Sequence, residues 1–171
     1  MVHRMKSEKK DWVIRAAMDA DKAEIYALYQ AQIGREYCAW DAHYPGMKDI
    51  EYDLSRDALF VMCDESARII ASISLDLDEQ VEMLSCWTPE LQPGGELSRL
   101  AVAEDMQNQG IARKMLIYAM QVLAERGKKS VHFLVNKYNE KALRSYAHLQ
   151  CQCVGTCELY DQPFLCFEKE L

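Results

Sequence analysis

A six-residue stretch, Gln107 to Ala112, has the composition of a loop that binds a phosphate group. It lies between an aliphatic run and a long helical pattern, so its N–H groups join those of the first helical turn at the positive end of the helix dipole. Gly110 would let the backbone approach an anion closely, and Ala112 leaves the first turn unobstructed. The stretch lacks the Lys-Ser or Lys-Thr of a Walker A loop and the G-x-G-x-x-G of a Rossmann fingerprint. Taken alone, it is also compatible with an ordinary strand-to-helix connection.

The elements that precede this loop are predicted from hydrophobic periodicity and turn residues. We expect a strand over Trp12–Ala17, then a helix with Asp19 or Asp21 as its N-cap, and a second short helix over Lys48–Arg56. Ala58–Cys63 and Arg68–Asp78 then read as a β-hairpin.

The second half of the chain alternates strands and helices. The expected elements are a loop over Thr88–Gly95, strands at Glu96–Val102 and Val131–Val135, a helix over Ile111–Arg126 stopped by Gly127, a helix from Asn139 to about His148, and final runs at Cys153–Leu159 and Phe164–Glu168. This order predicts an α/β fold in which helices pack on a mixed sheet.

Size and charge narrow the function classes. The 171 residues, half of them hydrophobic, fit a single domain, with residues 1–11 as a charged N-terminal extension. The net charge of −7 argues against nucleic acid and anionic membranes as partners, and no apolar run is long enough to span a bilayer. The N-terminus has no secretory pattern and the seven cysteines are an odd number, so we expect reduced thiols and a cytoplasmic location.

The loop and its surroundings resemble motif A of the GCN5-related N-acetyltransferase (GNAT) family, whose pattern is Q/R-x-x-G-x-G/A after an aliphatic strand. Leu97–Val102 is that strand, and Gly110 follows Val102 at the spacing of the family. Asn139, Ala142 and Tyr146 match motif B, although the Gly-Phe that often follows it is replaced by residues 148–151. The resemblance extends from Trp12 to the end and implies a GNAT-like fold of about seven largely antiparallel strands, splayed at the centre, with about four helices.

The resemblance implies acetyl-CoA as the acetyl donor, with its pyrophosphate on the motif A loop. The implied donors are the backbone amides of Gln107, Asn108, Gln109, Gly110, Ile111, Ala112 and Arg113. The pantetheine arm would pair with the preceding strand at Leu100, Ala101 and Val102. Val131–Val135 would form the other wall of the wedge, with Asn139 reaching the arm.

Acetyl transfer to an amine needs a base for the ammonium, a donor for the oxyanion and an acid for the sulfur. The resemblance implies Tyr146 as the acid, against the alternative of a core tyrosine, and a backbone N–H of Leu100–Val102 as the oxyanion donor. Glu96 is the candidate base; the alternative is a solvated strand-end residue. Its competitors are a water chain and Asp76, Asp78 and Glu82.

The acceptor site is expected between the first helices and the loop before the motif A strand. The candidates there are aromatic or basic: Tyr37, Trp40, His43, Tyr44 and Trp87. They could stack on a flat substrate or surround a cation, and plain core packing is the alternative for each. His43 is also a possible base.

A C-terminal group of His148, Cys151, Cys153 and Cys157 suggests a metal site. Its spacing lacks the paired C-x-x-C of structural zinc sites, and the resemblance places these cysteines along one face of a strand. We therefore expect buried thiols and no metal.

The sequence thus predicts an N-acetyltransferase that moves the acetyl group of acetyl-CoA to a primary amine by direct attack in a ternary complex. The acceptor is expected to be a small amine or amino compound. A protein or peptide acceptor, and a non-catalytic CoA-binding module on the same fold, remain the alternatives. A homodimer through Cys151–Leu171 is possible.

Overall fold

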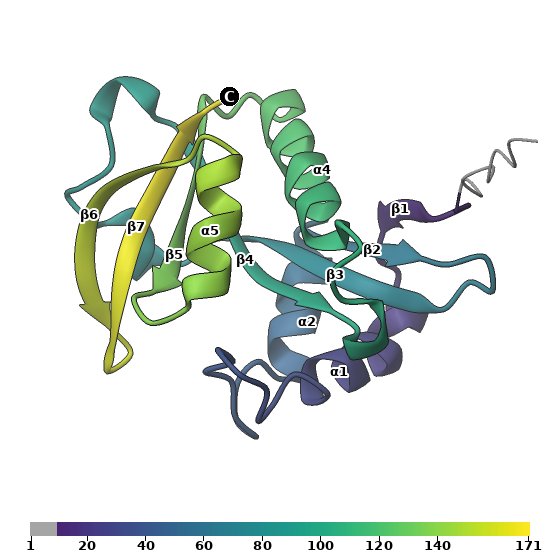
Figure 1. The fold of residues 1–171 in the computed structure, drawn as a ribbon. Helices are drawn as coiled ribbons and strands as arrows, with labels where there is room; N and C mark the ends of the chain where they lie inside the picture. The colour runs from purple at the N-terminus through teal and green to yellow at the C-terminus, as the bar shows by residue number, and fades with distance from the viewer. Residues whose placement is uncertain (1–9) are drawn as a thin grey trace, which may run out of the picture.

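Seven strands form one sheet in the order β1-β2-β3-β4-β5-β7-β6 (Figure 1). The computed structural model describes residues 10–171, so residues 1–9 of the predicted extension lie outside the described residues. The strands are β1 Val13–Ala16, β2 Leu59–Cys63, β3 Ile69–Asp76, β4 Gly94–Val102, β5 Ser130–Asn136, β6 Gln152–Leu159 and β7 Gln162–Glu170. Neighbouring strands are antiparallel except β4 and β5, which are parallel, so the predicted mixed and largely antiparallel sheet is confirmed.

Five α-helices pack on the sheet: α1 Lys22–Gln30, α2 Met47–Ser55, α3 Glu79–Glu82, α4 Ile111–Glu125 and α5 Glu140–His148. The four longer ones agree with the prediction. The additional helix, α3, is a single turn capped by Asp78, whose side chain accepts the Gln80 N–H, and one turn is too short to show periodicity. At the start of α1, Asp21 occupies the N-cap position without a capping hydrogen bond, because its carboxylate binds Arg15 and the Met18 N–H instead.

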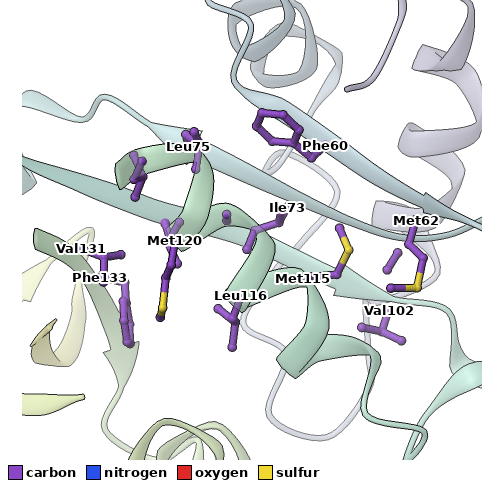
Figure 2. Packing of buried hydrophobic residues seen from close by; sticks show 14 of the residues in the cluster. Phe60, Met62, Ile73, Leu75, Val102, Met115, Leu116, Met120, Val131 and Phe133 are labelled. Atoms are coloured by element: carbon purple, nitrogen blue, oxygen red, sulfur yellow. The ribbon is translucent and has the colours of Figure 1, made fainter. Parts of the chain in front are cut away.

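The two larger of three hydrophobic clusters cover the two faces of the sheet, and the third gathers Val81, Trp87 and Cys166. On one face α4 buries a stripe that includes Met115, Leu116 and Met120 against Ile73 and Phe133 (Figure 2). On the other face α1 and α2 bury a second set of side chains: Ile25, Leu28, Tyr29, Ile50, Leu59, Val61 and Ala101. The residues of β2 are buried without exception because this strand is covered on both faces.

The long helix α4 ends as the sequence predicts. Gly127 lies at φ +82°, its N–H donates to the carbonyl of Ala124, and the N–H of Lys128 donates to that of Leu123. These two bonds form a Schellman motif, in which the left-handed residue is usually glycine because a side chain is disfavoured there.

The central strands β4 and β5 separate soon after they begin. They pair only from Gly94 opposite Ser130 to Glu96 opposite His132, and Figure 1 shows them diverging beyond that point. On the other edge of β4 the register against β3 shifts, since Ser72 pairs with Ala101 but Ser74 pairs with Ser98. The extra residue in β4 is a β-bulge that contains Arg99 at φ +48°. The sheet is therefore splayed at its centre.

The packing of α4 on β4 requires a glycine at position 95, because a Cβ atom there would clash with the Leu123 side chain. We expect Gly95→Ala to lower the free energy of unfolding by about 1–3 kcal/mol through overpacking. The double variant Gly95→Ala/Leu123→Ala should lose clearly less stability than the sum of the losses measured in the two single variants. Additive losses in denaturant titrations would contradict this account of Gly95.

Candidate functional site

The motif A loop forms an open cradle at the N-terminus of α4. Gly110 occupies the N-cap position in the left-handed region at φ +75°, and Asn108 is also left-handed at φ +60°. A Cβ atom added at Gly110 would meet no atom within 4 Å, so this glycine is not required by crowding from the protein itself. A cavity of about 240 Å³ adjoins it, lined by Gln107, Asn108, Gly110, Ile111, Ala112 and Arg113 among others. An anion at this helix end fits both the free N–H groups and the space.

One predicted loop residue does not line that cavity. The side-chain oxygen of Gln109 instead accepts a hydrogen bond from the ammonium group of Lys10. Gln107 holds the loop to the sheet, because its Nε2 donates to the Val102 carbonyl at 2.9 Å. Its Oε1 accepts from Lys141 Nζ of α5 at 3.1 Å, which ties the loop to the second motif.

The open edge of β4 presents the backbone of Leu100 and Val102. Alternate residues of an antiparallel strand direct both backbone groups to the same neighbour. The N–H of Ala103 donates to Ile70 on β3, so Ala101, which pairs with Ser72, also faces β3 while Leu100 and Val102 face the wedge. Ala101 therefore lies away from the edge predicted for the pantetheine arm, and its side chain is buried in the core with α1.

The Val102 carbonyl confirms which way this edge faces. Besides Gln107 it accepts hydrogen bonds from Gln32 Nε2 and Arg35 Nη1, both at 3.2 Å. Three donors converge on one carbonyl, so the edge of β4 is strongly polar at this point. Gln32 and Arg35 were not predicted from sequence, because nothing in their spacing connects them to a strand about 70 residues away.

A larger cavity of about 410 Å³ occupies the wedge between β4 and β5. Its walls come from Leu100 and Val102 of β4, 134–136 of β5, and Asn139, Ala142 and Tyr146 at and in α5. Val102, Gln107, Ala112, Leu116, Lys141 and Ser145 line both this cavity and the one beside Gly110. The loop and the wedge therefore form one connected site.

Tyr146 lies against two phenylalanines at the wedge. Its ring centroid is 4.4 Å from that of Phe133 and 6.1 Å from that of Phe167, which fixes the orientation of the side chain. Burial, with a smaller contribution from Cys151, raises the pKa of Tyr146 to about 12. The phenol is therefore protonated near neutral pH and can serve as a proton donor.

Asn139 opens α5, and its side chain has a structural role. Its Oδ1 accepts the N–H of Ala142 at 3.1 Å, which caps the helix. The residue also lines the large cavity, and its side-chain nitrogen remains available for the contact with the cofactor arm that was predicted.

Glu96 is buried, which contradicts the alternative of a solvated strand-end residue. The residue is 4% exposed, and its Oε1 has no hydrogen-bond partner among the described residues. Burial, reinforced by the charges of Asp76, Asp78 and Glu82, raises the pKa of Glu96 to about 9. Glu96 does not line the large cavity.

The aromatic acceptor candidates separate into two groups. Tyr37, Trp40 and Tyr44 line the large cavity, and the hydroxyl of Tyr44 accepts a hydrogen bond from Arg99 Nη1 at 3.1 Å. Trp87 is a core residue away from the cavity, because its Nε1 donates to the Val81 carbonyl and its ring lies 4.6 Å from that of His132. His43 is exposed and does not line the cavity either.

The β6–β7 hairpin adds cavity residues that sequence analysis missed. Tyr160, Gln162 and Phe164 line the wedge, although they belong to neither motif. Tyr160 and Asp161 form the turn, at φ +53° and +59°. The only available signal was a two-residue turn between two strands, and Tyr-Asp is not a sequence that predicts such a turn.

The cysteines do not share one buried face as predicted. Cys151 precedes β6 and is buried, Cys153 is exposed and Cys157 is half-buried. A register shift between Cys153 and Gly155 interrupts the alternation between Cys153 and Cys157 along β6. All seven cysteines are free thiols. Within residues 10–171, no three His, Cys, Asp or Glu side chains are grouped to hold a metal ion. None of the helices in this part of the chain could cross a membrane.

The burial of Glu96 generates a prediction about stability and pH. Because its pKa rises from 4.5 to about 9 on folding, its protonation stabilises the fold at low pH, and this stabilisation is lost as the pH rises through that range. We expect Glu96→Gln to increase the free energy of unfolding at pH 7. The change caused by the substitution should be more favourable at pH 7 than at pH 4.5 by about 2–4 kcal/mol. Denaturant titrations across this pH range would measure it. The exposed Glu158→Gln is the control, and equal pH dependence in wild type and Glu96→Gln would contradict the prediction.

Comparisons with known proteins agree with this geometry. The sequence model of the acetyltransferase (GNAT) family matches residues 22–150. No curated protein sequence matches the chain significantly.

Several solved structures share the fold. An acetyltransferase of the GNAT family from Listeria monocytogenes has a TM-score of 0.73 at 16% identity, covering 94% of this chain and 95% of that one. The ribosomal-protein-S18-alanine N-acetyltransferase of Escherichia coli has a TM-score of 0.70 at 16% identity, covering 93% of each chain. A chain of the NatC complex bound to Gag peptide and CoA has a TM-score of 0.71 at 16% identity, covering 94% of this chain and 98% of that one. With the family match over 22–150, these results confirm the resemblance: the chain belongs to the GNAT family of acetyl-CoA-dependent N-acetyltransferases.

Proposed function

We propose that this protein transfers the acetyl group of acetyl-CoA to a primary amine of a small molecule by direct attack in a ternary complex. The observation that carries the proposal is the connected site, which runs from the N-terminus of α4 along β4 to the phenol of Tyr146. An extended anionic ligand can bind at one end of such a site while an amine enters from the other.

The residues at the cofactor end are suited to hold and align acetyl-CoA, which supplies an acetyl thioester. The backbone amides of residues 110–113 would bind the pyrophosphate at the N-terminus of α4. The backbone groups of Leu100 and Val102 would pair with the pantetheine arm like an added strand. Arg35 now donates a hydrogen bond to the Val102 carbonyl. When the pantetheine arm pairs with this carbonyl, Arg35 would either give up that bond or move together with the carbonyl. Binding in the wedge would therefore affect the segment between α1 and α2, to which Arg35 belongs.

Tyr146 would donate the proton that the departing thiolate needs. Its phenol is held at the wedge by Phe133 and Phe167, and burial keeps it protonated near neutral pH. Proton donation to a leaving group is general acid catalysis, and the departing thiolate of CoA is the group that would receive this proton.

The proton of the substrate ammonium would leave towards Glu96 through water. Glu96 is 4% exposed and does not line the large cavity, so a bridging water would be needed between its carboxyl group and the amine. A bound ammonium favours the ionised carboxylate and lowers its pKa, because opposite charges stabilise each other. Glu96 would therefore become a competent base when the cationic acceptor arrives.

A peptide acceptor is the main alternative, because two fold neighbours are an N-acetyltransferase for ribosomal protein S18 alanine and the NatC complex bound to Gag peptide. Tyr44 and Tyr160 line the large cavity, and the hydrogen bond from the Tyr160 hydroxyl to Asp78 at 2.5 Å holds the β6–β7 turn beside it, which favours a small acceptor. If the protein releases CoA from acetyl-CoA when short peptides are added, but not when small amines are added, the acceptor is a peptide.

The cofactor cradle can be tested by thermal melting. Acetyl-CoA at a hundredfold excess over its dissociation constant adds about 2.7 kcal/mol of stability. We expect it to raise the melting temperature by about 5–10 °C. Gly110→Asp should abolish this shift, because it places a carboxylate where the pyrophosphate binds.

Gly127→Asp is the matched control. Gly127 is also left-handed, at φ +82°, and a Cβ atom added there also meets nothing within 4 Å, but it lies at the opposite end of α4. This variant should keep the full shift. An unchanged shift in Gly110→Asp, or no shift in the wild type at millimolar acetyl-CoA, would refute the assignment of the cradle.

The role of Tyr146 can be tested by Tyr146→Phe, which removes only the hydroxyl. We expect kcat to fall about 10²-fold or more, as is typical for loss of a general acid, while the affinity for acetyl-CoA is unchanged. Tyr138→Phe, at a residue 68% exposed, should retain full activity. If Tyr146→Phe keeps the wild-type rate, the phenol is a packing residue; if the wild type itself has no rate with any amine, the protein is a CoA-binding module.

A further inference from the structure

Three of the seven cysteines come together from three separate segments of the chain. Cys166 of β7 is buried, and the half-buried Cys86 and Cys157 pack against the same hydrophobic cluster. Cys86 lies in the segment between α3 and β4, and Cys157 lies in β6. None of the three lines either cavity. We call Cys86, Cys157 and Cys166 the thiol cluster.

The strand register places the thiol cluster on one face of the β6–β7 hairpin. Cys166 pairs with Gly155 and Cys157 pairs with Phe164, so the two cysteines lie diagonally on the same face. Cys86 covers this face, because a Cβ atom added at Gly155 would lie 2.7 Å from the Cβ of Cys86 and 3.5 Å from its Sγ. Since Gly155 has no side chain, Cys86 can lie directly beside Cys166.

The three sulfur atoms are in contact. The thiol of Cys166 is hydrogen-bonded to those of Cys86 and Cys157. Burial and these two neighbours raise the pKa of Cys166 above its ordinary value, so it remains a thiol near neutral pH. A buried thiol reacts slowly with oxidants in the solvent. The half-buried Cys86 is therefore the partner at which oxidation of this pair begins.

One pair in the thiol cluster suits a disulfide better than the other. Diagonal neighbours on antiparallel strands, such as Cys157 and Cys166, lie about 7–8 Å apart. A disulfide needs Cβ atoms about 3.5–4.5 Å apart. Cys86 belongs to neither strand, and its Cβ lies against Gly155, directly opposite Cys166. The geometry therefore favours Cys86 as the partner of Cys166.

We propose that Cys86 and Cys166 form an oxidation site, at which hydrogen peroxide converts the two thiols into an intramolecular disulfide. In the first step the Cys86 sulfur takes one peroxide oxygen to become a sulfenic acid, the O–O bond breaks, and one water leaves. In the second step the Cys166 sulfur attacks the Cys86 sulfur, the S–O bond breaks, and the hydroxyl leaves with the Cys166 proton as a second water. The two thiols lose two electrons in total, and the peroxide gains them. Contact between the sulfurs makes the second step intramolecular and fast.

The thiol cluster adjoins the wedge. Leu134 of β5 packs against the cluster and also lines the large cavity. Phe164 of β7, which is paired with Cys157, lines the same cavity. A disulfide between Cys86 and Cys166 would tie the segment between α3 and β4 to β7. Oxidation would therefore restrain a strand that supplies part of the cavity wall.

The disulfide can be detected by treating the reduced protein with one equivalent of hydrogen peroxide and blocking the remaining thiols. We expect the number of free thiols to fall from seven to five. Digestion after glutamate should then release residues 83–90 joined to residues 159–168, and a reducing agent should separate them. Because Glu158 lies between Cys157 and Cys166, this digestion also distinguishes the two possible partners of Cys86.

Two variants test the geometry. Cys86→Ala should abolish the joined species. Gly155→Ala keeps both cysteines but places a methyl group against the Cβ of Cys86, so we expect the disulfide to form at least tenfold more slowly. Thr156→Ala, at an exposed position of the same strand, is the matched control and should leave the rate unchanged. Melting curves show whether each variant is folded.

Several outcomes would overturn this inference. They are survival of all seven thiols, a disulfide that joins Cys86 to Cys157, crosslinks between molecules only, and an unchanged rate in a folded Gly155→Ala. None of these measurements uses catalysis, so their failure would leave the proposed N-acetyl transfer untouched.

Discussion

The site depends on one buried ionic contact, between Arg99 of β4 and the carboxylates of α2 and β3. Arg99 Nη2 lies 2.9 and 3.0 Å from the two oxygens of Asp53, and Nη1 lies 2.9 Å from Asp76. The guanidinium is 4% exposed, so the contact is made in a medium where breaking it would leave charges unpaired at a cost of several kcal/mol. Because Arg99 sits in the bulge of β4, this contact fixes the strand at the point where it turns away from β5. The contact therefore holds β4 along the stretch that forms one wall of the wedge.

The same contact organises the acceptor end. Burial alone would raise the pKa of Asp76, but the charge of Arg99 and its hydrogen bond outweigh it and hold that pKa below its ordinary value. Asp76 is therefore ionised beside Glu96, and it contributes to the repulsion that keeps Glu96 protonated. Arg99 also donates to the Tyr44 hydroxyl, which aligns one wall of the cavity. Strand geometry, cavity shape and local charge thus have a common origin.

The sequence predicts those parts of the molecule that are local. The stripe of α4, its stop at Gly127 and the left-handed Gly110 follow from residue spacing and turn chemistry, and they fix the fold and the cofactor end. The acceptor end could not be predicted in the same way, because it is assembled by contacts such as Tyr160 with Asp78 that join distant segments. Trp87 and His43 were predicted for the acceptor site but do not line the cavity, since an aromatic residue near a loop can face a core or solvent as readily as a ligand.

The two ends of the connected site differ in how their polar groups are satisfied. The cofactor end holds its cations in hydrogen bonds to backbone and glutamine, which an anionic ligand can exchange one for one. Glu96 Oε1 has no hydrogen-bond partner among residues 10–171, so an incoming donor, a cation or a water molecule could satisfy it. If Glu96 is the base, as proposed above, a bound ammonium would favour its ionised form, whereas binding of the cofactor would not. The base would then be activated only when the acceptor is present.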